Sequence, residues 1–279
     1  MTLPTFLGIG VPRGGTTWLH GLLDAHPEIY MPSRRKEVRF FDAHFEKGTD
    51  WYEAFFCGPE ERGAFRAIGE VSPQYIYCHE CPRRIAETLP GVRLVLMLRH
   101  PVDRAYSQYG FVLQRRNFQG SFQDFLASRP KALEYGYYSR YVRKFLDIFP
   151  RSDLLPLVSE QAFADVPGTC RQLSVFLDVP AEGFAVDTGK STVNRSTIPK
   201  AQRMAGMGVS VARRFRRMGL ETVVDAARRA GVQRVFRGAA VPRLDPALKA
   251  ELSRDYNSEF ELLEDLLEVD LSPWRTEVP

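Results

Sequence analysis

Short apolar runs alternate along the chain with segments in which apolar residues recur every three or four positions. The apolar runs predict strands at residues 5–10, 66–71, 93–99 and 153–159. The amphipathic segments predict helices at residues 17–24, 82–89, 101–114, 136–149, 166–176 and 246–267. This alternation is typical of a parallel sheet covered by helices. We therefore predict an α/β fold with a P-loop-like parallel sheet, in a single domain that spans residues 1–279.

The clearest chemical signal lies between Phe6 and Leu19. An apolar strand ends there in a turn rich in Gly and Thr, and a helix is expected to begin near Thr17. Such a turn directs backbone N–H groups and the positive end of a helix dipole at one point, which favours a bound phosphate. We expect this phosphate site to be formed by Arg13, Gly14, Gly15, Thr16, Thr17 and Trp18.

The charged residue of the turn distinguishes it from a nucleotide-hydrolysing P-loop. That motif reads Gly-x-x-x-x-Gly-Lys-Ser/Thr, and its lysine reaches the terminal phosphates. When Gly10, Gly15 and Thr17 are set on this frame, Thr16 takes the place of the lysine, and the cation is Arg13 instead. The alternative enzyme is a kinase or NTPase, and this chain lacks the lysine that such an enzyme needs in the turn.

A strand followed by Pro-Arg/Lys-x-Gly-Thr-Thr resembles the 5′-phosphosulfate loop of sulfotransferases. The resemblance covers residues 6–195, and residues 270–274 are compatible with it. It implies that the donor is 3′-phosphoadenosine 5′-phosphosulfate, that the product is adenosine 3′,5′-bisphosphate, and that no metal is needed. It also implies that Arg13 stabilises the leaving phosphate.

Two further positions match the donor site of this family. Arg99 is expected at the carboxyl end of a strand, where α/β sheets bind ligands, and Ser107 lies two turns along the next helix. The resemblance implies that Arg99 and Ser107 bind the 3′-phosphate of the donor. A later loop is similar to the segment that closes over this phosphate, which adds Lys190 and Arg195.

The segment from Arg34 to Asp42 resembles the Lys-Glu-x-x-Phe-Phe-Asp motif of Golgi-type sulfotransferases, especially the heparan sulfate O-sulfotransferases. Their glutamate is the general base, and by position this residue is Glu37. A carboxylate within hydrogen-bond reach can take the proton that the acceptor hydroxyl loses. Asp42 and His44 are the reserve candidates for this role.

The sequence Gly-Glu-Val-Ser-Pro-Gln-Tyr, which begins at Gly69, is similar to the family motif Glu-Lys-Ser/Thr-Pro-x-Tyr. The similarity implies contacts between the substrate and Glu70 or Ser72, while Glu70 could instead orient other groups. Val71 departs from the motif, because a lysine often contributes to substrate or sulfonate binding there.

Basic residues are concentrated in one segment. The whole chain has a net charge of +4, whereas residues 200–243 contain eleven Lys and Arg against two acids. We predict that they form a basic helical insert on the acceptor side. It suits a glycan, lipid or other small-molecule acceptor that is anionic or associated with a membrane. No nucleic acid is expected, since Phe215 and Phe236 are the only aromatic residues of the segment.

Other features narrow the interpretation. Cys78 and Cys81 form a single Cys-x-x-Cys pair without a second pair, so we expect no metal site. Without a signal peptide pattern or an apolar run of about 18 residues, a cytoplasmic location is expected. A sulfotransferase that acts on a hydroxyl group is the favoured function. A kinase or NTPase, and a non-enzymatic module that binds anions or nucleic acid, remain the alternatives.

Overall fold

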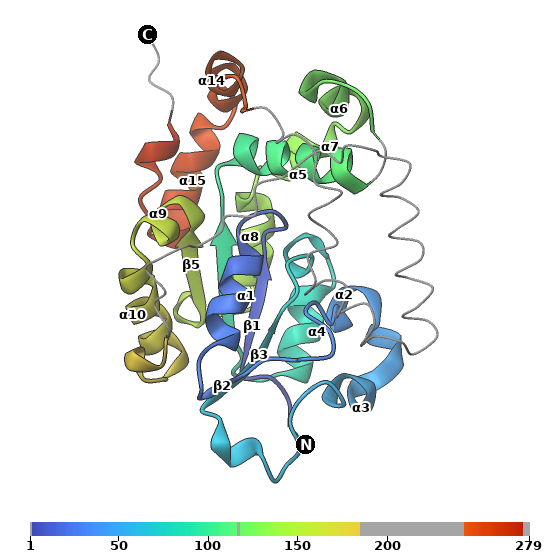
Figure 1. Ribbon diagram of the computed structural model, residues 1–279, viewed down its shortest axis with the longest axis vertical. Helices are drawn as coiled ribbons and strands as arrows, with labels where there is room; N and C mark the ends of the chain where they lie inside the picture. Colours follow the sequence, from blue (N-terminus) through green and yellow to red (C-terminus); the bar gives the residue numbers. More distant parts are fainter. Residues whose placement is uncertain (1, 116–117, 185–242, 276–279) are drawn as a thin grey trace, which may run out of the picture.

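The computed structural model describes residues 2–115, 118–184 and 243–275. Five parallel strands form one sheet in the order β2-β3-β1-β4-β5 (Figure 1). This confirms the predicted α/β fold with a parallel sheet. The strands are β1 (Phe6–Gly10), β2 (Ile29–Tyr30), β3 (Ala67–Val71), β4 (Arg93–Leu98) and β5 (Leu154–Val158).

Alternate residues of the central strands point into two separate cores. In β4, Leu94, Leu96 and Leu98 belong to one apolar cluster. Val95 and Met97 of the same strand belong to the other cluster. Because successive side chains of a strand point to opposite faces, both faces of the sheet are buried.

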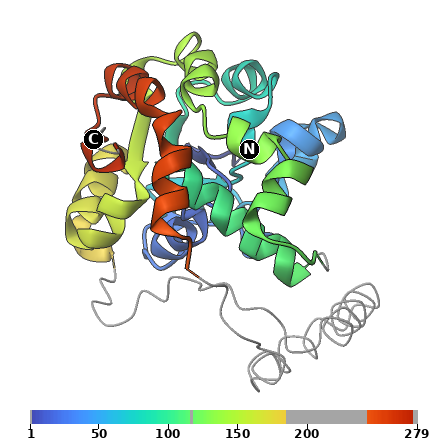
Figure 2. The same cartoon turned by 90° about the horizontal axis from the view of Figure 1, so that it is seen from above.

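Helices cover both faces (Figures 1 and 2). One face packs against α1 (Thr16–Asp24), α9 (Ser159–Ala164) and α10 (Val166–Leu177). The other packs against α4 (Cys81–Thr88), α5 (Pro101–Arg115), α8 (Ser139–Leu146) and α15 (Asn257–Leu267). On this second side also lie α2 (Phe40–Ala43), α3 (Gly48–Glu53), α6 (Phe122–Ser128), α7 (Lys131–Glu134) and α14 (Pro246–Arg254).

The four predicted strands are present, and each end lies within one residue of its predicted position. β2 was not predicted; it has two residues and pairs only with the first two residues of β3. Pro156 lies within β5 without disrupting the sheet, because β5 is an edge strand and proline lacks an N–H group to donate.

The predicted helix at 246–267 is wrong as a continuous element. It is divided into α14 and α15 at Asp255 and Tyr256. Tyr256 is buried, and its hydroxyl donates to the Leu133 carbonyl at 2.7 Å. The break places this ring in the core beside α7, an arrangement that helical periodicity does not reveal.

The helix predicted at 136–149 begins later, at Ser139. The Ser139 N–H and hydroxyl donate to the Glu259 carboxylate at 2.6 and 2.8 Å. Glu259 belongs to α15, so a residue distant in sequence satisfies the start of α8. Local sequence could not supply this cap.

Candidate active site

A cavity of about 900 Å³ lies at the carboxyl edge of the sheet. The segments that follow β1, β3, β4 and β5 all contribute to its wall. This is the edge at which open α/β sheets bind ligands. The lining includes Arg13, Gly15, Thr16, Thr17, Trp18, Glu37, Gln74, Tyr77, Arg99, Ser107, Gln108, Phe111, Arg129, Tyr135, Glu160 and Phe163.

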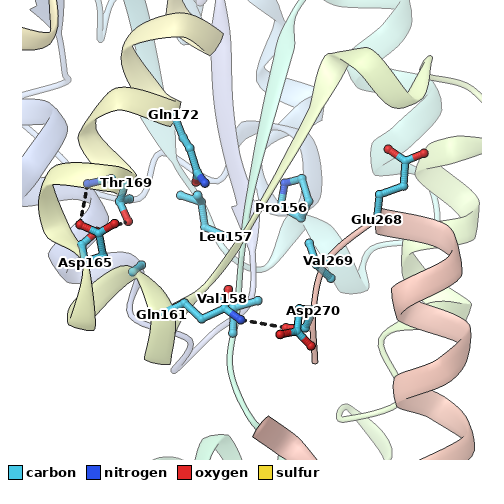
Figure 3. A pocket seen from close by; sticks show the side chains of 12 residues that line it. Pro156, Leu157, Val158, Gln161, Asp165, Thr169, Gln172, Glu268, Val269 and Asp270 are labelled. Atoms are coloured by element: carbon cyan, nitrogen blue, oxygen red, sulfur yellow. Dashed lines mark hydrogen bonds between the residues drawn. The ribbon is translucent and has the colours of Figure 1, made fainter. Parts of the chain in front are cut away.

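A smaller cavity of about 360 Å³ lies between α10 and the segment after α15 (Figure 3). Three carboxylates, Asp165, Glu268 and Asp270, are among the residues that line it. Asp165 already accepts the Gly168 N–H at 2.8 Å, as an N-terminal cap of α10. This acidic lining opposes an anionic ligand, so the larger cavity is the candidate site.

The turn between β1 and α1 has room for no side chain at its two central glycines. A Cβ atom at Gly14 would lie 2.7 Å from the Met97 carbonyl oxygen. Gly15 has a φ of +100°, and a Cβ atom there would lie 2.8 Å from the Phe163 ring. The packing therefore requires glycine at both positions.

Backbone N–H groups at this turn remain available to a ligand. Among the described residues, no backbone carbonyl accepts the N–H of Gly15, Thr16 or Thr17. They belong to the first turn of α1, where N–H groups have no partner within the helix and the dipole favours an anion. The residues present therefore fit the phosphosulfate end of the expected donor.

Arg13, Arg99 and Ser107 lie together, although 94 residues separate the first from the last. The Arg13 guanidinium donates through Nε and Nη2 to Ser107 Oγ at 3.1 and 3.0 Å. It also lies 5.1 Å from the centre of the Phe111 ring. Arg99 Nη1 donates to the Arg13 carbonyl at 3.2 Å. Three of the predicted donor residues thus form one cluster.

The backbone of Arg13 is unusual for a residue with a side chain. Its φ of 72° lies in the left-handed region. Such a conformation costs roughly 1–3 kcal/mol. Here it accompanies the hydrogen bonds that join Arg13 to α5.

An aromatic wall borders the same cavity. Trp18 of α1 and Phe163 of α9 meet edge to face, with ring centroids 5.1 Å apart. Trp18 was predicted as a donor-site residue, whereas Phe163 was missed. Its position on the helix that follows β5, at the carboxyl edge of the sheet, was the available signal.

Glu37 is half-buried and lines the cavity that Arg13 and Thr17 also line. The neighbouring backbone is fixed from β3. The Val38 N–H donates to Glu70 Oε2 at 3.0 Å, and the Arg39 N–H donates to Ser72 Oγ at 3.0 Å. Two consecutive hydrogen bonds therefore hold the chain immediately after Glu37.

Glu70 is a fully buried carboxylate with four hydrogen-bond donors. Its Oε1 accepts the hydroxyls of Tyr52 and Tyr75 at 2.9 and 2.7 Å. Its Oε2 accepts the Ser72 hydroxyl at 2.6 Å and the Val38 N–H at 3.0 Å. Burial raises the pKa of Glu70, while these hydrogen bonds act in the opposite direction.

The substrate-binding role predicted for Glu70 and Ser72 needs correction. Both residues have 0% exposure, and their side chains are engaged inside the protein. A substrate in the cavity cannot reach them, so they position the Glu37 segment instead. Val71 is likewise buried and packs close to Gly8, which leaves no room for a lysine directed at the cavity.

The reserve bases have other partners. Asp42 forms an ion pair with Arg39 at 2.5 Å, and His44 lies 3.2 Å from a nitrogen of Arg35. Neither residue lines the cavity. Of the three candidate bases, Glu37 alone borders the space that the phosphate-binding turn borders.

Lys36 belongs to the segment from Arg34 to Asp42 but was not predicted as a site residue. Its ammonium donates to Thr17 Oγ1 at 2.6 Å, which joins the Glu37 segment to the phosphate-binding turn. Position next to the candidate base was the available signal. Because the two preceding residues, Arg34 and Arg35, are exposed basic residues, the sequence gave no sign that the Lys36 side chain turns inward.

Several predictions lie outside the described residues. They concern Lys190, Arg195 and all but the last residue of the basic insert at 200–243. In the described ranges, no group of three or more His, Cys, Asp or Glu residues could hold a metal ion. No helix there is long and apolar enough to cross a membrane.

Cys78 lies beside Cys81, and a hydrogen bond between the two side chains is the main reason that the pKa of Cys78 is lowered to about 6.

Comparisons with known proteins agree with this geometry. Residues 3–205 match the family model described as a sulfotransferase domain. The human bifunctional heparan sulfate N-deacetylase/N-sulfotransferase 2 is 31% identical over 196 residues, which cover 63% of this chain and 22% of that protein. The mouse heparan sulfate glucosamine 3-O-sulfotransferase 3A1 is 29% identical over 184 residues, covering 63% of this chain and 46% of that protein.

The chain thus spans less than half the length of these two curated relatives. A solved sulfotransferase from Alicyclobacillus acidocaldarius superposes with a TM-score of 0.70 and 23% identity. The superposition covers 99% of this chain and 100% of that one. At this level of identity, the likeness concerns the fold.

Proposed function

Because this chain belongs to the sulfotransferase family, we propose that it transfers a sulfonate group from 3′-phosphoadenosine 5′-phosphosulfate to a hydroxyl group of a carbohydrate acceptor. The observation that carries this proposal is the cluster of Arg13, Arg99 and Ser107 beside the N–H groups of the turn, in a cavity that Glu37 also lines. The donor already carries an activated sulfonate. The protein therefore has to position this group and to stabilise the charge that grows on the leaving oxygen.

Each part of the cluster has a place in donor binding. The N–H groups of Gly15, Thr16 and Thr17 and the Arg13 guanidinium bind the phosphosulfate end. Arg99 and Ser107 bind the 3′-phosphate, while Trp18 and Phe163 offer aromatic surface to the adenine. Donors that are already oriented stabilise the charge that grows on the leaving phosphate oxygen, and this is usually the largest catalytic contribution.

Glu37 takes the proton that the acceptor hydroxyl loses. A positioned general base of this kind contributes typically about 10²- to 10⁴-fold to the rate. Glu70 and Ser72 keep the backbone next to Glu37 in place through Val38 and Arg39. Glu37 is therefore the catalytic base, and Glu70 is a positioning residue.

The rest of the cavity supports a polar acceptor. Gln74, Gln108 and Arg129 line it together with Tyr77 and Tyr135, whose rings stack 4.4 Å apart. Amide, guanidinium and phenol groups on an aromatic surface suit a sugar. The names of the two curated relatives describe action on heparan sulfate, which supports a carbohydrate for this chain as well.

The assignments of the donor and of the acceptor are tested by separate experiments. Calorimetry should detect binding of adenosine 3′,5′-bisphosphate without added metal, and chelator should not change its affinity. Incubation with ³⁵S-labelled donor and a panel of polysaccharides, glycolipids and phenols should transfer the label to a saccharide hydroxyl, identified by mass spectrometry. Binding of magnesium ATP without binding of the bisphosphate would overturn the donor assignment. Label found only on phenols, or only on the lipid part of the glycolipids, would overturn the carbohydrate assignment.

A further inference from the structure

Lys36 makes a contact that donor binding, as described above, does not use. It lies in the segment before α2, yet its ammonium reaches Thr17 Oγ1 in the first turn of α1 at 2.6 Å. Lys36 is half-buried, and Glu37 is its neighbour in the sequence. A flexible side chain that could extend into water is instead directed at the phosphate-binding turn.

The surroundings of Lys36 favour an anionic partner. Burial lowers the pKa of Lys36, the charge of Glu37 raises it, and the nearby Arg13 guanidinium lowers it further. Among the described residues, Lys36 forms no salt bridge with a carboxylate. Two cations held close together repel each other, and a bound anion between them removes this cost.

The position of Lys36 indicates which part of the donor it meets. Arg13 is held toward α5 by Ser107 and Phe111. Lys36 reaches the turn from a different part of the chain, the segment that carries Glu37. During transfer, the sulfur lies between the leaving oxygen at the turn and the acceptor oxygen at Glu37. Through its contact with Thr17, Lys36 connects the segment of Glu37 with the turn.

We propose that Lys36 binds the oxygens of the sulfonate group while it is transferred, so that Arg13 and Lys36 hold the two halves of the phosphosulfate. This inference rests on the proposed function. The bond between sulfur and the leaving phosphate oxygen breaks with its electrons on that oxygen. The bond between sulfur and the acceptor oxygen forms, and the hydroxyl proton passes to Glu37. Lys36 stays protonated throughout.

The alternative is that Lys36 only tethers its segment to Thr17. The two explanations predict different effects of a Lys36 substitution on the affinities for two nucleotides. Adenosine 3′,5′-bisphosphate lacks the sulfonate, whereas 3′-phosphoadenosine 5′-phosphosulfate carries it. A sulfonate contact distinguishes these ligands, but a tether affects both equally.

The experiment measures both affinities by calorimetry, without acceptor, for the full chain and for Lys36→Met, Lys36→Arg and Lys144→Met. Lys144 is exposed on α8, so its variant is a control for the loss of one positive charge. Lys36→Met should weaken binding of the sulfonated donor on the order of tenfold to a hundredfold, as expected for a hydrogen bond to a charged group. Its affinity for the bisphosphate should change by less than about threefold, and Lys36→Arg should restore part of the loss.

The outcomes separate the two proposals. If the full chain binds neither nucleotide, the proposed function fails. If the full chain binds both, and Lys36→Met changes the two affinities by the same factor or changes neither, the sulfonate contact is overturned. Retained affinity for the bisphosphate shows that the Lys36→Met variant is folded.

Discussion

The phosphate-binding turn and the segment that carries Glu37 border the same cavity but are built in different ways. The turn is contiguous, and its geometry follows from Gly14, Gly15 and the start of α1. The Glu37 segment is held from outside, because Val38 and Arg39 donate to groups at the end of β3. The first region is formed by consecutive residues, whereas the second is held in place by a buried carboxylate more than thirty positions away.

Replacing the base should have the largest effect and leave the donor side intact. We expect Glu37→Gln to lower kcat by about three orders of magnitude, within the range of about 10²- to 10⁴-fold for a general base. The affinity for adenosine 3′,5′-bisphosphate should not change, because the amide has the same shape and does not contact the turn. Turnover of labelled donor and calorimetry measure the two quantities.

Glu46→Gln is the matched control, since Glu46 is exposed and follows α2 in the same region. It should retain full turnover. Full turnover in Glu37→Gln would instead move the base to another residue. The turn and the Glu37 segment would then differ in how they are held in place, but the Glu37 segment would not carry the base.

Replacing Arg13 should affect both binding and turnover. Loss of one oriented donor typically costs about 10²- to 10³-fold in kcat. We expect Arg13→Ala to show this loss together with weaker bisphosphate binding, since Arg13 also holds Ser107. Arg93→Ala is the control, because Arg93 is exposed at the opposite edge of the sheet. Equal behaviour of the two variants would contradict the role of Arg13.

The contrast explains what the sequence could predict. The turn, the helix after it and the strands that frame it follow from local patterns, and so does the placement of Arg99 and Ser107 at a strand end and on the next helix. The burial of Glu70 and Ser72 could not be predicted in this way, since it depends on Tyr52 and Tyr75 packing over β3. The inward turn of Lys36 and the break at Tyr256 likewise depend on partners far along the chain.

A change at Glu70 tests the long-range support directly. All four partners of Glu70 are donors, so Glu70→Gln turns an amide N–H₂ group toward at least one of them. An unsatisfied buried group costs about 1–3 kcal/mol, and we expect the free energy of unfolding to fall by this amount. Turnover should fall by about tenfold or more as Glu37 loses its position. Bisphosphate affinity should persist.

Glu259→Gln provides the comparison for Glu70→Gln, because Glu259 is also buried and also accepts hydrogen bonds, at the start of α8. Urea denaturation should show a similar loss of stability in this variant. Its kcat should not change. If the two variants lose turnover equally, Glu70 acts through stability alone and not through the position of Glu37.

The donor side also depends on distant parts of the chain, and a pH series can isolate one of these contacts. His100 follows Arg99, has 3% exposure and packs against Phe260 and Trp274 from the C-terminal part of the chain. Burial is the main reason that its pKa is lowered from 6.5 to about 4. Between these values the unfolded chain binds a proton that the folded protein does not. Stability is therefore complete above pH 6.5 and is lost as the pH falls toward 4.

From pH 7.5 to pH 5.0, this residue should remove roughly 2 kcal/mol from the free energy of unfolding, at about 1.4 kcal/mol for each pH unit below 6.5. His100→Gln should reduce that slope whatever its effect on stability at pH 7.5, because glutamine does not titrate. Equal slopes in the parent and in His100→Gln would mean that His100 is protonated in the folded protein. The packing behind Arg99 would then tolerate a charge, and the donor side would depend on distant residues less than its structure indicates.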